Sequence, residues 1–427
     1  MSPSELAFLF ILVVLYALVA ARLDRLSITM PLVFVLVCAA LGPYGLGLIN
    51  FQPETGDVEH LTELTLAVLL FADASTLDFS KVAQAANLPG RLLLVGLPLT
   101  ILLGAGVAYG LFPAQGLGFA LLLGTILAPT DAALGLPIFN NPRVPVRIRT
   151  ALNVESGLND GIATPLVTLF IALTVAEEGS SQAGWLAGAL EQIGIAVLAG
   201  ALIGLAGGML FRWAATKHWT TKTAQQIGNL ALALVCYYGS LALGGNGFIA
   251  AFIGGLAFGY AARYELDEAT EFTESAGTLL SLFVWAVFGA NVVIPLVRDF
   301  NPRALLFAVL ALTLVRMLPV AIALSGARLR PDTRLMMGWL GPRGLASVVF
   351  MLLASESLRE AGIDSSLLLA MAGWTITLSV LFHALSAVPL AGWYARRLET
   401  ASPDAPELLE VAEISASRKS LAHSRQT

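Results

Sequence analysis

The residues best placed to do chemistry in this sequence are carboxylates and amides inside long apolar segments. Residues 153–160 read Asn-Val-Glu-Ser-Gly-Leu-Asn-Asp. In a helix, this spacing puts Glu155 and Asn159 on one face, and Ser156 and Asp160 on the neighbouring face. An ionisable side chain inside a membrane is costly unless it is paired or hydrated. A carboxylate removed from water favours a bound proton or a small cation. Asp160 is our first candidate for that role.

A second polar group lies in an apolar segment that two prolines interrupt. Thr130 and Asp131 stand between them, one proline two residues before Asp131 and the other six residues after it. Prolines remove backbone hydrogen bonds and predict an unwound stretch, which membranes tolerate where it lines a cavity. Hard cations prefer oxygen ligands, which Asp160, Asp131, Ser156 and Thr130 would supply. Asp131 could instead serve only to neutralise the end of a half-helix.

Two arginines also fall inside apolar segments. Arg316 is too deep to reach the membrane surface easily, and we expect it to pair with Glu155 as a structural ion pair that leaves Asp160 for the cation. Arg343 follows Gly341 and Pro342 at a second break. There it either compensates the negative ends of helices or has a purely structural role. Matching breaks in two halves of a chain are expected of an inverted-repeat transporter.

The composition places these residues in a membrane. Of 427 residues, 57% are hydrophobic and 12% charged, the mean hydropathy is +0.80 and the net charge is −5. These values exclude a soluble globule, a disordered chain and a nucleic-acid-binding protein. We predict an all-α polytopic membrane protein with about thirteen transmembrane helices. They fall at 5–21, 28–42, 59–74, 92–112, 117–138, 151–176, 184–212, 224–243, 246–262, 276–297, 304–326, 334–354 and 366–395.

The positive charges orient these segments. With the N-terminus outside, thirteen crossings place nineteen of the 24 Lys and Arg residues on the inner side and three on the outer side. The first apolar segment lacks the basic start of a cleavable signal peptide, so we expect it to be retained. We therefore predict a transmembrane domain over 1–397 and a short, disordered cytoplasmic tail over 398–427.

Several functions are disfavoured by what the sequence contains. The cysteines, Cys38 and Cys236, form no disulfide framework, the four histidines are scattered, and we find no nucleotide-binding GxGxxG motif in the tail. We therefore expect no cofactor, and a membrane-embedded enzyme would need clustered histidines or a motif such as HExxH. An organic-anion symporter would need helix N-termini that converge without a carboxylate between them, and Asp131 argues against it.

Taken in order, these motifs form a recognisable set. It resembles the monovalent cation:proton antiporter family, in particular its sodium/proton, NhaP-like branch, over roughly residues 5–395. The residues that carry the resemblance are Thr130-Asp131, Glu155-Ser156-x-x-Asn159-Asp160, the glycine-rich stretch Asn246–Gly259, Arg316 and Gly341-Pro342-Arg343-Gly344.

The resemblance implies an inverted-repeat antiporter fold with crossed broken helices, and a homodimer in the lipid of the cell membrane. It also implies exchange of sodium or lithium against protons in pH homeostasis. Sodium would bind at Asp160 and Asp131, with Asp160 as the carrier and Asn159, Thr130 and Ser156 shaping the site. In the family, an Asn-Asp pair here is associated with electroneutral exchange. Potassium/proton exchange would use the same residues and is left open.

Overall fold

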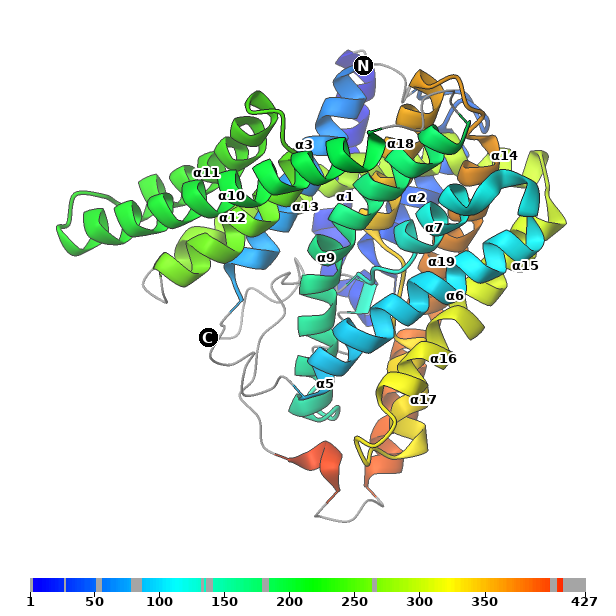
Figure 1. Ribbon diagram of the computed structural model, residues 1–427. Helices are drawn as coiled ribbons and strands as arrows, with labels where there is room; N and C mark the ends of the chain where they lie inside the picture. The colour runs from blue at the N-terminus through cyan, green and yellow to red at the C-terminus, as the bar shows by residue number, and fades with distance from the viewer. Residues whose placement is uncertain are drawn as a thin grey trace.

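The computed structural model describes residues 3–26, 28–50, 56–77, 87–131, 134–135, 141–178, 184–262, 267–399 and 405–409. Over these ranges the chain is helical and contains no strand (Figure 1). The helices of the first half are α1 (Pro3–Arg25), α2 (Met30–Leu41), α3 (Gly56–Ser75), α5 (Asn87–Arg91), η1 (Leu92–Gly96), α6 (Leu97–Leu111), η2 (Pro113–Gln115), α7 (Gly116–Ile126) and α9 (Val146–Glu178).

The second half continues in the same way. Its helices are α10 (Trp185–Thr216), α11 (Lys222–Ala242), α12 (Gly247–Ala262), α13 (Asp267–Phe288), η4 (Gly289–Val293), α14 (Ile294–Arg298), α15 (Pro302–Leu312), α16 (Leu314–Ala323), α17 (Pro331–Trp339), α18 (Leu345–Glu360), α19 (Ser366–Leu398) and η5 (Pro406–Leu408). Each segment predicted from the sequence coincides with one helix or with consecutive helical pieces. The later part of the predicted segment 117–138 lies mostly outside the described residues.

The apolar surface of this bundle faces outward, as a membrane requires. Among the described residues, seven helical stretches are long and apolar enough to cross a membrane, and shorter apolar helices accompany them. Leu18, Leu94 and Leu202 are each more than two-thirds exposed. Exposed apolar side chains on helices of this length fit a surface that faces lipid. The start of α1 and the end of α19 lie at opposite faces of the molecule (Figure 1). The number of thirteen crossings stays a prediction.

Two helices are interrupted, and the breaks touch. The chain leaves α7 at Ile126 and runs without helical structure to Asp131, and it leaves α17 at Trp339 and resumes as α18 at Leu345. Across the crossing, the amide of Asp131 donates to the carbonyl of Pro342 (2.9 Å), and Ser347 Oγ donates to the carbonyl of Ile126 (2.7 Å). Each break thus supplies hydrogen-bond partners that the other lost by unwinding.

Close glycine contacts fix α10 against α12. A Cβ added at Gly204 would stand 2.2 Å from the carbonyl oxygen of Gly254, and one at Gly200 would stand 2.5 Å from that of Ala250. Membrane helices often associate through small residues of this kind, because no hydrophobic force drives their association in lipid.

We predict that Gly204→Ala will destabilise the protein by about 1–3 kcal/mol, because the added methyl group must push backbone apart. Thermal unfolding of the purified protein in detergent measures this change. Gly194→Ala is the matched control on α10, since its Cβ would meet nothing within 4 Å. Equal melting temperatures for the two variants would contradict the packing argument.

Candidate functional site

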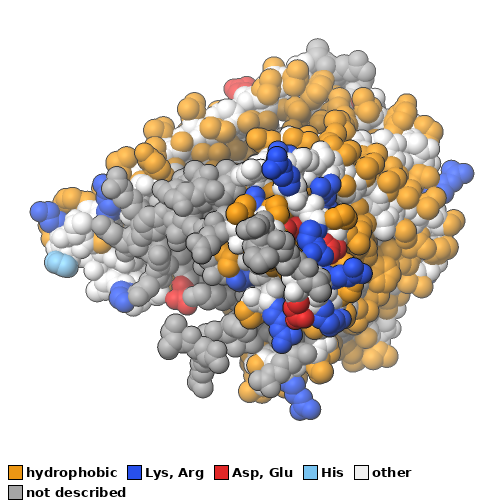
Figure 2. Space-filling model, turned by 90° about the horizontal axis from the view of Figure 1, so that it is seen from below, with side chains coloured by type: hydrophobic (Ala, Val, Ile, Leu, Met, Phe, Trp, Pro, Cys, Tyr) orange, Lys and Arg blue, Asp and Glu red, His pale blue; other side chains and the backbone are white. Residues whose placement is uncertain are grey.

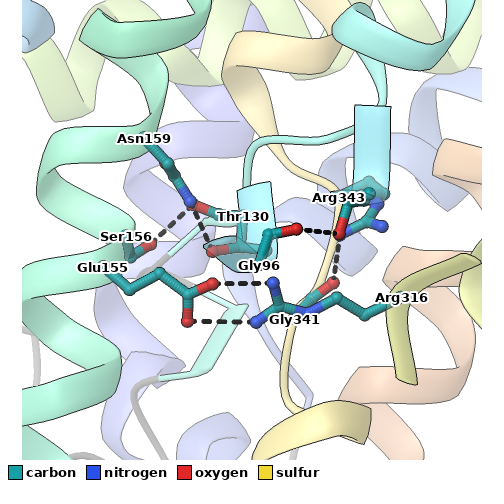
Figure 3. A network of polar contacts seen from close by, with 9 residues as sticks. Gly96, Thr130, Glu155, Ser156, Asn159, Arg316, Gly341 and Arg343 are labelled. Carbon is teal, nitrogen blue, oxygen red and sulfur yellow. Dashed lines mark hydrogen bonds and ion pairs between the residues drawn. The ribbon is translucent and has the colours of Figure 1, made fainter. Parts of the chain in front are cut away.

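The middle of α9 meets the first break through two hydrogen bonds. Ser156 Oγ donates to the carbonyl of Thr130 (2.6 Å), and Asn159 Nδ2 donates to Thr130 Oγ1 (2.7 Å) (Figure 3). All three residues are buried. Asn159 Oδ1 is also buried and has no hydrogen-bond partner in the described part of the chain. This cluster therefore presents an unused carbonyl oxygen beside Asp160.

Asp160 lies one position further along α9 and is partly exposed. Its backbone carbonyl accepts a hydrogen bond from Thr164 Oγ1 (2.8 Å). Next to it, Gly161 packs so closely on the ring of Phe252 of α12 that a Cβ would come within 2.2 Å of the ring. The Oδ1 atom of Asp160 is itself buried. Carboxylate and amide oxygens are the ligands that a hard cation needs.

Asp131 is directed at the start of the second half-helix. Its Oδ2 accepts a hydrogen bond from the amide of Leu345 (2.9 Å), the first residue of α18. The fit depends on Gly344, where a Cβ would stand 2.0 Å from the same carboxylate. A carboxylate at a helix N-terminus offsets the positive end of the helix dipole. This contact matches the helix-end role, one of the two roles that the sequence leaves open for Asp131.

Arg316 of α16 forms a bidentate ion pair with Glu155. Arg316 Nη1 donates to Glu155 Oε1 (2.6 Å), and Nη2 donates to Oε2 (3.0 Å) (Figure 3). Both side chains are 2–3% exposed. Gly341 packs against the guanidinium, since a Cβ there would be 2.3 Å from Arg316 Nε. The pair joins α9 to α16 and lies beside the second break.

Arg343 is fully buried in the second break, just beyond the end of α17. Its Nη1 donates to the carbonyl of Gly341 (2.9 Å), and its backbone amide donates to Ser379 Oγ (2.6 Å). Its Nε and Nη2 have no hydrogen-bond partner within the described ranges. A cation here faces the carbonyl end of α17, in the position for helix-end compensation.

Sequence reasoning missed part of the support around Arg343. His383 of α19 is buried, stacks on the ring of Trp339 (centroids 5.1 Å apart) and contacts its carbonyl through Nε2 (2.8 Å). Ser379, one turn earlier, accepts from Arg343 and also contacts His383 Nδ1 (3.3 Å). The polar pair at i,i+4 in an apolar segment was the available signal.

Interrupted helices that cross around buried charges and polar oxygens define the fold of an ion transporter. Residues 9–393 match the family model described as "Sodium/hydrogen exchanger, transmembrane". The chain therefore belongs to the sodium/hydrogen exchanger family, and the resemblance noted in the sequence is confirmed.

Related proteins are similar over most of this chain. The K⁺/H⁺ antiporter NhaP of Alkalimonas amylolytica is 25% identical over 93% of this chain and 67% of its own length. The Na⁺/H⁺ antiporter ApNhaP of Aphanothece halophytica is 25% identical over 73% of this chain and 60% of its own length. The Na⁺/H⁺ antiporter NhaS2 of Synechocystis is 28% identical over 68% of this chain. The alignments span half to about two-thirds of these relatives.

A solved structure has the same fold. It is that of the sodium proton antiporter MjNhaP1 from Methanocaldococcus jannaschii at pH 8, with a TM-score of 0.71. Its sequence identity to this chain is 21%, and the match covers 93% of this chain and 98% of that structure. The prediction of an all-α antiporter fold is therefore confirmed.

Removing one partner of the buried ion pair should be severe. Glu155→Gln leaves the Arg316 guanidinium buried without its carboxylate, and we expect a loss of about 3–5 kcal/mol in stability. Melting of the purified variant in detergent checks this. The double variant Glu155→Leu/Arg316→Met should regain most of the loss, because no charge is then stranded. A single variant as stable as the wild type would contradict a structural role for the pair.

Proposed function

We propose that this protein is a secondary active antiporter that exchanges sodium or lithium for protons at Asp160. The observation that carries the proposal is the position of Asp160 beside the buried cluster of Thr130, Ser156 and Asn159. That cluster supplies hard oxygen atoms, among them the unused Asn159 Oδ1. These are the ligands that small monovalent and divalent hard cations prefer.

The charges around the crossing support exchange of one cation for one proton. Glu155 and Arg316 neutralise each other, and Asp131 and Arg343 are opposite charges at neighbouring helix ends. In the proposed exchange, the carboxylate of Asp160 is neutralised in turn by a proton or by a monovalent cation. Asn159 cannot ionise, so it adds no second proton to the cycle.

The proposed cycle is competition at a single site. Sodium binds while Asp160 is ionised, a proton displaces it, and the site opens alternately to each side as one group of helices moves against the other. Asp131, Thr130, Ser156 and Asn159 shape the site, and Arg343 compensates helix ends. We expect neither a cofactor nor enzymatic activity.

We further propose a homodimer in the cell membrane, with the N-terminus outside and the C-terminal end in the cytoplasm. Basic side chains gather on the face that holds the end of α19 (Figure 2), as expected of a cytoplasmic face. The opposite positions of the start of α1 and the end of α19 agree with an odd number of crossings.

Potassium is the second candidate cation. Of the three related antiporters described above, one is named for K⁺ and two are named for Na⁺. The experiment that separates them uses everted vesicles with a preformed pH gradient. Addition of Na⁺, Li⁺ or K⁺ should collapse the gradient in the order of the cation's apparent affinity. We expect Na⁺ and Li⁺ to act at lower concentrations than K⁺.

We predict that Asp160→Asn will fold normally and abolish sodium-driven proton movement in everted vesicles, because the amide carries neither a proton nor the charge that binds sodium. Asp364→Asn is the matched control, since Asp364 lies in the exposed turn before α19 and hydrogen-bonds only locally, to Ser366. Normal transport by Asp160→Asn would exclude Asp160 as the carrier.

We also predict that exchange is electroneutral. In proteoliposomes, a membrane potential imposed with potassium and valinomycin should leave the initial rate of sodium/proton exchange unchanged. Asn159→Asp adds a second ionisable group and should make any remaining exchange sensitive to the potential. A wild-type rate that changes with the potential would show that more than one proton moves per sodium ion.

A further inference from the structure

A short piece of the C-terminal tail is folded against the helical body. Residues 405–409 pack at the end of the molecule where α17 begins and α19 ends, and η5 is drawn there in red (Figure 1). Ala405 is 9% exposed, and Glu407 is completely buried. These five residues belong to the segment 398–427, for which the sequence predicts a disordered tail. The apolar and proline residues around Glu407 were the only sequence sign of this packing.

Glu407 caps the first turn of α17. Its Oε1 accepts hydrogen bonds from the backbone amide of Arg330 (2.7 Å) and from Thr333 Oγ1 (2.9 Å). Thr333 Oγ1 also lies 3.0 Å from the hydroxyl of Tyr394 on α19. A carboxylate in this position satisfies an amide at the helix start and offsets the positive end of the dipole.

The same segment reaches the start of α9. Arg147, in the first turn of α9, donates from Nη1 to the carbonyl of Pro406. The Glu407 carboxylate is a charged neighbour of Arg147. Near Glu407, the side chains of Arg330 and Asp332 pair with each other (2.8 Å). The tail thus joins α9 to the start of α17, and Thr333 links this contact to α19.

The opposite end of α9 makes an equivalent contact. Glu177, in the last turn of α9, accepts a hydrogen bond at Oε2 from the amide of Gly118 (2.8 Å). This is the start of α7, the helix that leads into the first break. The fit is tight, because a Cβ at Gly116 or Gly118 would stand less than 3 Å from Glu177 Oε2.

Both helices that lead into the crossing are therefore capped by a carboxylate from outside their own sequence. α7 takes Glu177 from α9 itself, and α17 takes Glu407 from the tail, which α9 holds through Arg147. In this way α9, which carries Glu155, Asn159 and Asp160, is fastened at each of its ends to one of the two half-helices.

We propose that Glu407 is a positioning residue for ion exchange. In this proposal the segment 405–409 links α9 to α17 at the inner side of the membrane. This inference rests on the proposed function, because it concerns the affinity of the same cation site. The carbonyl end of α17 leads directly into Leu340–Gly344, where the two breaks cross. The anion at the start of α17 offsets the positive end of this helix and fixes its position, while Arg343 faces its carbonyl end at the crossing.

The experiment compares Glu407→Ala and Glu407→Gln with Glu399→Ala and Glu399→Gln in the full-length chain. Glu399 is an exposed carboxylate next to the end of α19 and serves as the matched control. We expect Glu407→Ala to raise the apparent KM for Na⁺ by about twofold to tenfold. Glu407→Gln should have a smaller effect, because its amide oxygen can still accept from Arg330 and Thr333.

The readout separates positioning from simple stabilisation. KM is measured on purified, correctly folded protein in proteoliposomes, so a lower yield of folded protein does not affect it. If Glu407→Ala lowers the melting temperature but keeps the KM for Na⁺ of the Glu399 variants, Glu407 only stabilises the fold. That result would overturn the proposal. Wild-type protein that exchanges no monovalent cation would instead refute the proposed function, independently of Glu407.

Discussion

The structure depends on one constraint: two unwound backbones in an apolar interior must satisfy each other's hydrogen bonds. Backbone groups that lose their helical partners inside a membrane must find other partners within the protein or in a cavity. The amide of Asp131 donates to Pro342, the carboxylate of Asp131 accepts from Leu345, and Ser347 donates to Ile126. The breaks can exist only because they cross. The glycine at position 344 is needed because any larger residue would occupy the space of the Asp131 carboxylate.

Most charged side chains at the crossing lie next to a side chain of opposite charge or next to a helix end of opposite polarity. Glu155 and Arg316 form a close pair, and Asp131 and Arg343 face helix ends of opposite polarity. These contacts hold the crossing in place beside Asp160, which lies on a partly exposed turn of α9. In the proposed function Asp160 is the carrier, and rigid surroundings would keep the ligands of its site in position.

Much of this could be predicted from the sequence, because charged residues are rare in the apolar segments and each therefore stood out. The partner of Arg316 followed from that scarcity. The helices followed from the apolar segments, and the two breaks from the prolines and glycines that interrupt them. The caps were harder to find. Glu177 and Glu407 lie at polar ends, where acids are common and carry no signal, and their partners are distant in sequence. The supporting residues Ser379 and His383 depend on how α19 packs against α17, which no local pattern specifies.

The interlocked breaks also constrain how the chain is made. The partners of Asp131 at Pro342 and Leu345 belong to the last third of the sequence, as does the partner of Glu155 at Arg316. During synthesis, the first half of the protein therefore enters the membrane before the final partners of Asp131 and Glu155 have been made. We therefore expect the first half to reach its final contacts only once α17 and α18 have been made.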